Sequence, residues 1–129
     1  MASPQDRFRK ITAVLGVAGV GLGAFGAHGL EDRLSVEMLE VYQTGVFYHL
    51  IHVVALFALT LASESLWQGK AATRVAISWV LGIILFSGSL YVLAVSGISK
   101  LGMITPFGGL AFIAGWVFIV GLRPNGTQS

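Results

Sequence analysis

Four long apolar stretches divide the chain, at about residues 11–30, 44–62, 75–95 and 104–122. None of them contains an Asp, Glu, Lys or Arg. A helix needs about 20 apolar residues to cross the hydrocarbon of a bilayer, and each stretch is close to that length. Strands of a membrane barrel would be about ten residues long with strict alternation, which these stretches lack. The pattern therefore predicts an all-α membrane protein with a bundle of four transmembrane helices, whose backbone groups are satisfied within each helix.

The segment between the first two stretches, residues 35–43, has a helical pattern of its own. Ser35 is a suitable N-cap. Val36, Leu39 and Tyr42 fall near one helical face, and two glutamates fall on another. We predict a short amphipathic helix here, lying at the membrane surface. A solvated surface helix is the alternative.

Basic residues are distributed unevenly between the two ends of the predicted bundle. Arg33 and Lys100 lie at one end, and the other end carries six basic residues: Arg7, Arg9, Lys10, Lys70, Arg74 and Arg123. Cytoplasmic segments are enriched in Lys and Arg, so both termini are predicted to be cytoplasmic in a multi-pass protein of the cell (inner) membrane. The first stretch could instead be a signal peptide, but it is longer than the 7–15 apolar residues typical of one.

Small residues recur on one face of each predicted helix. In lipid, such faces allow helix backbones to approach closely, so they predict a tight bundle within one chain or between copies. Gly21, Gly23 and Gly26 also match a dinucleotide-binding pattern, which requires a soluble βαβ unit that this chain does not offer. The predicted packing positions are Gly16, Gly19, Gly23, Gly26, Ala55, Ala58, Gly82, Gly108 and Gly115, with Ser78, Ser89 and Ser96 on the same side of the third helix as Gly82.

Composition supports a single membrane domain over residues 1–129. The chain is 55% hydrophobic and 11% charged, with a mean hydropathy of +0.81, whereas soluble domains carry about 25% charged residues. The lipid bilayer must cover the surplus apolar surface, because a soluble chain this small cannot bury it. A formal net charge of +2 without a basic run argues against nucleic acid as a partner.

Polar side chains inside the stretches are the candidates for chemistry. Proton-coupled transporters usually need an acidic or basic group within the membrane, and the only ionisable candidates in or beside these spans are three histidines. They fall, with several hydroxyls, towards the outer half of the predicted helices. The candidate polar site comprises His28, Tyr48, His49, His52, Ser87, Ser89, Tyr91 and Thr105.

Two interpretations of these histidines stay open. His49 and His52 could be ligands of a metal or haem, or a proton relay. The interpretation we favour is that they hold the bundle in register through hydrogen bonds to hydroxyls and carbonyls. Zinc sites usually need three or four ligands, and the chain has no cysteine and no buried carboxylate to supply them. We therefore expect no metal and no cofactor.

Local signals at the helix ends complete the pattern. Pro106 suits the first turn of the fourth helix, with Thr105 as its N-cap. Gly29 is expected to end the first helix, and Gly88, Gly108 and Gly109 are possible helix breaks. The aromatic residues near the ends of the stretches are typical of a belt at the membrane interface: Trp67, Trp79, Trp116, Tyr42 and Tyr48.

Four sequence motifs carry a family resemblance. They are LGAFGAHGL at 22–30, YQTGVFYH at 42–49, SGSLY at 87–91 and LGMITPFGGL at 101–110. Together they resemble the DUF423 family, also called UPF0382, which includes small bacterial inner-membrane proteins and the animal transmembrane protein 256. The resemblance spans nearly the whole chain and implies a four-helix multi-pass protein. It implies no reaction, substrate or cofactor, and it gives none of the motif positions a catalytic role.

Three functions remain compatible with these features. The first is a non-enzymatic accessory bundle that binds a second copy of itself or another membrane protein, favoured by the small-residue faces and the lack of charge within the spans. The second is a permease for a small molecule or ion, with the polar layer as its site and the glycines interrupting its helices. The third is a metal- or haem-binding membrane protein that uses His49 and His52.

Overall fold

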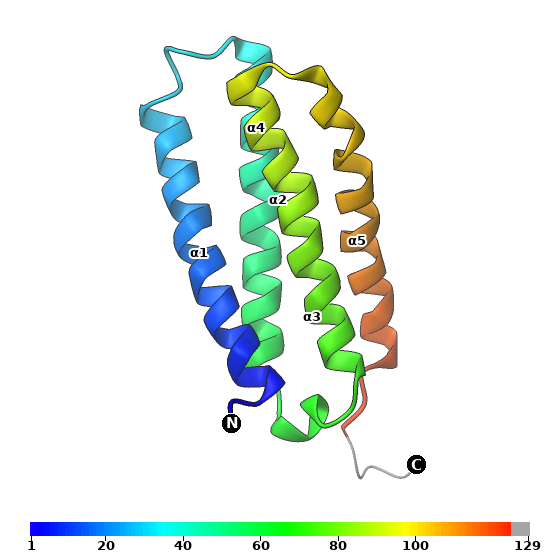
Figure 1. The fold of residues 1–129 in the computed structure, drawn as a ribbon. Helices are drawn as coiled ribbons and strands as arrows, with labels where there is room; N and C mark the ends of the chain where they lie inside the picture. Colours follow the sequence, from blue (N-terminus) through cyan, green and yellow to red (C-terminus); the bar gives the residue numbers. More distant parts are fainter. Residues whose placement is uncertain (125–129) are drawn as a thin grey trace.

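The computed structural model describes residues 1–124 and consists of four long helical rods (Figure 1). Each rod is long and apolar enough to cross a membrane. The chain is an all-α, multi-pass membrane protein. The first two rods are α1 (Pro4–His28) and α2 (Val36–Thr60), followed by the short helix η1 (Glu64–Trp67). The third rod joins α3 (Ala71–Gly82), η2 (Ile83–Ser87) and α4 (Gly88–Ser96), and the fourth joins η3 (Ser99–Met103), α5 (Thr105–Phe118) and η4 (Ile119–Gly121).

The helix starts are set by local capping groups. Ser3 forms a capping box with Asp6, and Pro4 occupies the first turn, so α1 begins before the apolar stretch. Ser35 caps α2 as expected, with its hydroxyl accepting the Met38 N–H at 3.1 Å. The amphipathic segment continues into α2 without a break, and the prediction of a separate helix is corrected in that respect.

The remaining capping predictions have mixed outcomes. Gly29 follows the last residue of α1, as expected. Pro106 lies in the first turn of α5, but Thr105 does not cap that helix through its side chain. Its hydroxyl instead contacts Ser89 at 2.6 Å. The predicted N-cap role of Thr105 is therefore wrong.

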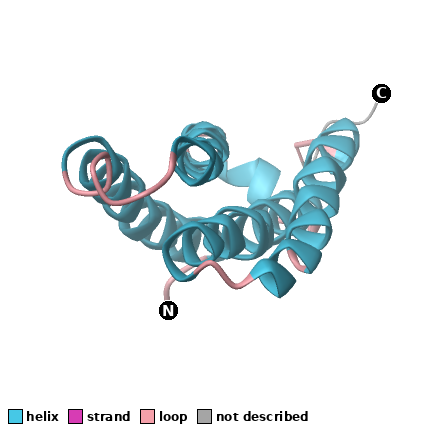
Figure 2. Cartoon of the chain, turned by 90° about the horizontal axis from the view of Figure 1, so that it is seen from above, coloured by secondary structure: helices cyan, strands magenta, loops and turns pink. Residues whose placement is uncertain are grey.

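The rods run up and down, and the N-terminus lies at the same end as the last described residues (Figure 1). α1 packs on α2, α2 packs on α4, and α3 packs on α5. Seen from above, the helices stand side by side with loops across their ends (Figure 2). The second and third rods are thus central, and α1 and α5 each have a larger uncovered face.

Glycines provide the close approach between these helices. A Cβ added at Gly19 would lie 2.7 Å from Leu50 Cδ2, and one at Gly26 would lie 2.8 Å from Tyr42 Cδ1. On the other side of the bundle, a Cβ at Gly115 would lie 2.5 Å from Trp79 Nε1. The other predicted glycines also face neighbouring rods: Gly16 faces Val53, Gly23 faces Val46, Gly82 faces Phe112 and Gly108 faces the backbone of Phe86.

The other small residues predicted to pack between helices differ in how far they are buried. Ala55 packs against the apolar core, whereas Ala58 is exposed. Ser96 is also exposed, and its hydroxyl donates back to the Val92 carbonyl of its own helix. The face that α2 buries includes His49, His52 and Leu56 rather than a continuous row of alanines.

The third rod contains one π-helical turn, η2, between two α-helical parts. The Gly88 N–H donates to the Ile83 carbonyl five residues back, and the rod continues beyond it as α4. Gly108 and Gly109 likewise lie within α5. The glycines predicted as possible helix breaks therefore leave the rods continuous.

The core has two parts. The larger lies towards the end with the termini and includes Leu56, Val75, Trp79 and Phe112. The smaller lies at the opposite end and comprises Leu30, Tyr42 and Ala94. His52 stacks on Phe112 of the larger cluster, and Tyr91 packs against the smaller one.

Candidate functional site

His49 connects three rods of the bundle. It lies near the middle of α2, where only 3% of its surface is exposed. Its Nε2 lies 2.8 Å from the Leu15 carbonyl of α1, and its Nδ1 lies 2.8 Å from the Tyr91 hydroxyl of α4. A carbonyl can only accept, so Nε2–H donates to Leu15, and in the neutral ring Nδ1 accepts from Tyr91.

His52, one turn further along α2, makes the corresponding link to α5. It is 4% exposed, and its Nδ1–H donates to the Tyr48 carbonyl at 2.8 Å. Its Nε2 accepts from the Trp116 indole N–H at 3.0 Å. The ring also stacks on Phe112 with a centroid distance of 3.7 Å. Both nitrogens of this neutral histidine therefore have a partner.

The hydroxyls of the third rod form a second group of contacts. Ser87 donates to the Gly45 carbonyl of α2 at 2.7 Å. Ser89 lies 2.9 Å from the Phe86 carbonyl of the π-helical turn and 2.6 Å from the Thr105 hydroxyl. These bonds connect α2, the third rod and the start of α5.

The side chains of two predicted site residues form no hydrogen bond in this network. The His28 side chain is exposed at the end of α1 and has no hydrogen-bond partner within residues 1–124. The Tyr48 side chain is 39% exposed and packs against Phe86 with a centroid distance of 4.6 Å. The structure thus brings His49 together with Tyr91, and Ser89 together with Thr105. His52 bonds to neither pair and contacts Trp116 of α5 instead.

Three of the five aromatic residues predicted to form a belt at the membrane interface lie in the core instead. Trp67, Trp79 and Tyr42 are 5%, 2% and 1% exposed, so the prediction is wrong for them. Trp116 is half exposed but supplies the donor for His52. Because residues 52 and 116 are far apart in the chain, helical spacing alone could not pair them.

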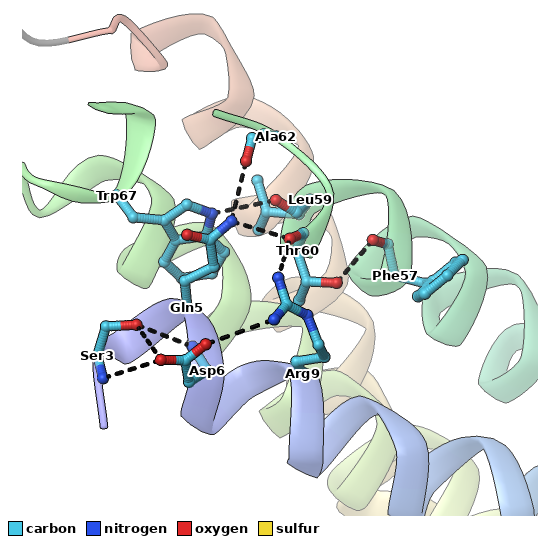
Figure 3. Close-up of polar contacts among 9 residues, drawn as sticks. All are labelled: Ser3, Gln5, Asp6, Arg9, Phe57, Leu59, Thr60, Ala62 and Trp67. Atoms are coloured by element: carbon cyan, nitrogen blue, oxygen red, sulfur yellow. Dashed lines mark hydrogen bonds and ion pairs between the residues drawn. The ribbon is translucent and has the colours of Figure 1, made fainter. Parts of the chain in front are cut away.

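A further polar cluster lies at the end with the termini and was not predicted (Figure 3). Gln5 Nε2 donates to the Thr60 and Ala62 carbonyls, both at 2.9 Å. Arg9 Nη2 donates to the same Thr60 carbonyl at 3.1 Å, and Trp67 Nε1 donates to Leu59 at 3.1 Å. These donors bind carbonyls at the end of α2 and just beyond it, a region where a helix leaves carbonyls without helical partners.

We call His49 and His52, with their partners Tyr91 and Trp116, the histidine layer. Its chemistry follows from these hydrogen bonds. A metal ion binds histidine through a nitrogen lone pair, but the acceptor nitrogens of His49 and His52 are directed at Tyr91 and Trp116. Among residues 1–124, no group of three or more His, Cys, Asp or Glu side chains is placed to hold a metal ion. The layer is built as a set of hydrogen bonds between helices.

Comparison with known proteins identifies the family. The family described as "Protein of unknown function (DUF423)" matches residues 22–109. The chain belongs to the DUF423 family. The match includes the motifs around His28, His49, Ser87 and Thr105 and confirms the resemblance drawn from them.

Named DUF423 relatives cover most of the chain. The UPF0382 membrane protein YwdK of Bacillus subtilis (strain 168) is 47% identical over 113 residues, which is 88% of this chain and 92% of that protein. A UPF0382 membrane protein of Haemophilus influenzae is 39% identical over 113 residues, covering 88% and 90%. The UPF0382 inner membrane protein YgdD of Escherichia coli (strain K12) is 38% identical over 119 residues, covering 89% and 88%. No solved structure matches the chain.

Proposed function

We propose that this DUF423 protein is a non-enzymatic accessory bundle that binds another membrane protein or a second copy of itself. The observation that carries the proposal is that His49, His52 and Ser87 form hydrogen bonds that join helices. A catalytic or transport site needs polar groups directed at a ligand, whereas these groups are directed at other parts of the chain. This leaves the outer surfaces of the bundle as the region through which it acts.

The uncovered faces of α1 and α5 are the surfaces we assign to the partner. Val14, Val17 and Val20 project from α1 and are 65–78% exposed. Ile113 and Val117 do the same from α5, at about 60%. A membrane partner would replace lipid on one of these faces through van der Waals packing, which is the main attraction between helices in a bilayer.

Site-specific photo-crosslinking in native membranes tests this assignment. A photoreactive amino acid at Val17 on α1 or at Ile113 on α5 should give a discrete protein adduct from one of the two faces. Mass spectrometry of the adduct would distinguish a second copy from a different protein. Adducts with lipid alone at both positions, together with a monomer in native mass spectrometry, would contradict the proposal.

Purified protein also gives a direct check on the metal and haem alternative. The accessory role predicts substoichiometric metal by elemental analysis and no Soret band in the absorption spectrum, because both histidines are engaged with Tyr91 and Trp116. Stoichiometric metal or a Soret band that disappears in His49→Leu would favour the alternative.

The proposal includes an orientation with both termini in the cytoplasm. Six basic residues at the end with the termini, against two at the other end, support it. Since the chain has no cysteine, single cysteines can be labelled without background. Arg33→Cys and Ser99→Cys should react with an impermeant maleimide on intact cells, whereas Ala2→Cys and Gln68→Cys should react only after permeabilisation. The reverse pattern would invert the orientation.

A further inference from the structure

A groove of about 310 Å³ lies between α1 and α2 on the lipid-facing surface, near the end with the termini. It exists because α1 presents small residues there, including Ala13 and Gly16. Across it, Val53 Cγ1 lies 3.5 Å from the position that a Cβ on Gly16 would occupy. Its walls are apolar apart from the residues nearest its mouth, and it is lined by Arg9, Thr12, Ala13, Gly16, Val53, Val54 and Phe57.

Arg9 places a cation at the mouth of this groove. Its side chain is 51% exposed and makes an ion pair with Asp6 at 3.4 Å. One Nη2 contact goes to the Thr60 carbonyl. A guanidinium carries five N–H donors in a planar fork suited to phosphate, so donors remain for a ligand beyond these two contacts.

The surrounding charge favours an anion. The end with the termini carries six basic residues and two acidic ones, Asp6 and Glu64, whereas the opposite end carries two basic and four acidic residues. Arg7 and Lys10, beside Arg9, are exposed and form no ion pair within residues 1–124. Basic pockets between transmembrane helices are typical binding sites for anionic lipid headgroups.

We propose that this groove binds an anionic phospholipid, with its phosphate on Arg9 and one acyl chain along Ala13 and Gly16. The groove follows α1 from Arg9 to Gly16, about 10 Å at 1.5 Å per residue. One leaflet of hydrocarbon is about 15 Å thick. The groove therefore accommodates the part of an acyl chain nearest its headgroup when that headgroup lies at the membrane surface. The site is independent of which side of the membrane this end faces.

Native mass spectrometry of the purified full chain tests the proposal. The protein is titrated with phosphatidylglycerol or with phosphatidylcholine of the same acyl chains. Both lipids contain a phosphate, but the choline ammonium of phosphatidylcholine offsets its charge, so we expect phosphatidylglycerol to bind about tenfold more tightly. Glycerol phosphate, which has the anionic group without acyl chains, should not displace the bound lipid.

Matched variants distinguish the contribution of the Arg9 cation to lipid binding from that of the apolar groove. Arg9→Gln should remove the preference for phosphatidylglycerol, whereas Arg7→Gln removes the same charge at the same end but outside the groove and should retain it. Ala13→Phe should fill the groove and weaken both lipids, whereas Ala24→Phe, on an exposed part of α1 near the opposite end, should weaken neither. Gln5→Ala controls for the loss of a contact to the end of α2 without a change in charge.

Several results would overturn the proposal. They are equal binding of the two lipids by the unaltered protein, equal effects of Arg9→Gln and Arg7→Gln, no effect of Ala13→Phe, and displacement of the lipid by glycerol phosphate. Ala13 is exposed, so its substitution tests the groove without relying on a variant that disturbs packing.

Discussion

At the scale of single residues, His49 illustrates how a few polar atoms hold this bundle together. Its two ring nitrogens reach α1 and α4 from α2, so one side chain fixes the relative depth of three helices. A hydrogen bond between transmembrane helices is worth about 0.6 kcal/mol on average and up to about 1.7. The energy is small, but an apolar contact would not specify depth in the same way, because it tolerates sliding along the helix.

The coupling between His49 and Tyr91 can be measured. We expect His49→Leu and Tyr91→Phe each to lower the free energy of unfolding by about 1–2 kcal/mol, because each leaves a buried partner unsatisfied. In a double-mutant cycle the two effects should be non-additive by about 0.5–1.5 kcal/mol. Thermal unfolding in detergent provides the measurement. Tyr48→Phe is the control, since the Tyr48 hydroxyl has no hydrogen bond within the part of the chain described; additive effects would argue against the bond.

Two adjacent glycines make a sharper test of packing. A Cβ at Gly108 would collide with the backbone nitrogen of Phe86 and lie 2.7 Å from the Leu85 carbonyl carbon. A Cβ at Gly109 would lie 3.8 Å from the Phe86 ring, an ordinary contact. Gly108→Ala should therefore destabilise the bundle by about 2–3 kcal/mol or prevent its folding, while Gly109→Ala should be tolerated. Similar melting temperatures for the two variants would contradict this arrangement of α5.

At the scale of elements, the end of α2 is stabilised by residues from elsewhere in the chain. Gln5 and Arg9 come from α1, and Trp67 comes from η1 (Figure 3). The last carbonyls of a helix carry a partial negative charge, and a cation such as Arg9 is favourable there. The loop between α2 and α3 is thereby tied to the start of α1.

Removal of these donors should loosen one helix end only. Gln5→Ala removes two hydrogen bonds, and we expect a loss of about 1–2 kcal/mol. Hydrogen exchange measured by mass spectrometry should become faster around residues 58–62 and remain unchanged around His49. Gln43→Ala, which removes an exposed glutamine at the other end of α2, should leave exchange unchanged at both places. Faster exchange along the whole of α2 would show that the cluster has a wider role.

The helices and their small-residue faces could be predicted because each depends on residues close in sequence. Hydropathy located four spans, and glycine spacing located residues such as Gly19 and Gly26, which lie against α2. The partners of polar groups could not be predicted in this way. His52 of α2 meets Trp116 of α5 although α5 packs mainly on α3, and Gln5 of α1 meets Thr60 at the end of α2. Both contacts are determined by tertiary packing, which cannot be predicted from the spacing of residues along one helix.

At the scale of the whole molecule, the bundle consists of two helix pairs joined through the centre. α1 pairs with α2, α3 pairs with α5, and the contact of α2 with α4 joins the pairs. Gly45 lies at this junction, and a Cβ there would be 3.0 Å from the Tyr91 ring and 3.3 Å from the Ser87 carbonyl oxygen. The junction is therefore the place where a bulky side chain should separate the halves.

A cleavable loop would test that division. With a protease site inserted after Gln68, an exposed loop residue, the two halves of the unaltered chain should remain together in detergent after cleavage. Gly45→Leu should cause them to separate during affinity purification, because the added side chain cannot fit against Tyr91. Gly21→Leu adds the same side chain where no atom lies within 4 Å, so its halves should stay together. Separation in both variants would mean that the pairs are not joined at Gly45.

The π-helical turn at Ile83–Ser87 has a consequence for comparing relatives of different length. Such a turn holds one residue more than an α-helical turn would. Deleting one residue there would restore regular α-helix while leaving the directions of Trp79 on one side and Tyr91 on the other nearly unchanged. A deletion elsewhere in the same rod would rotate everything beyond it by about 100°. An alignment gap within 83–87 is therefore compatible with the same bundle, whereas a gap a few residues away would require its contacts to be rebuilt.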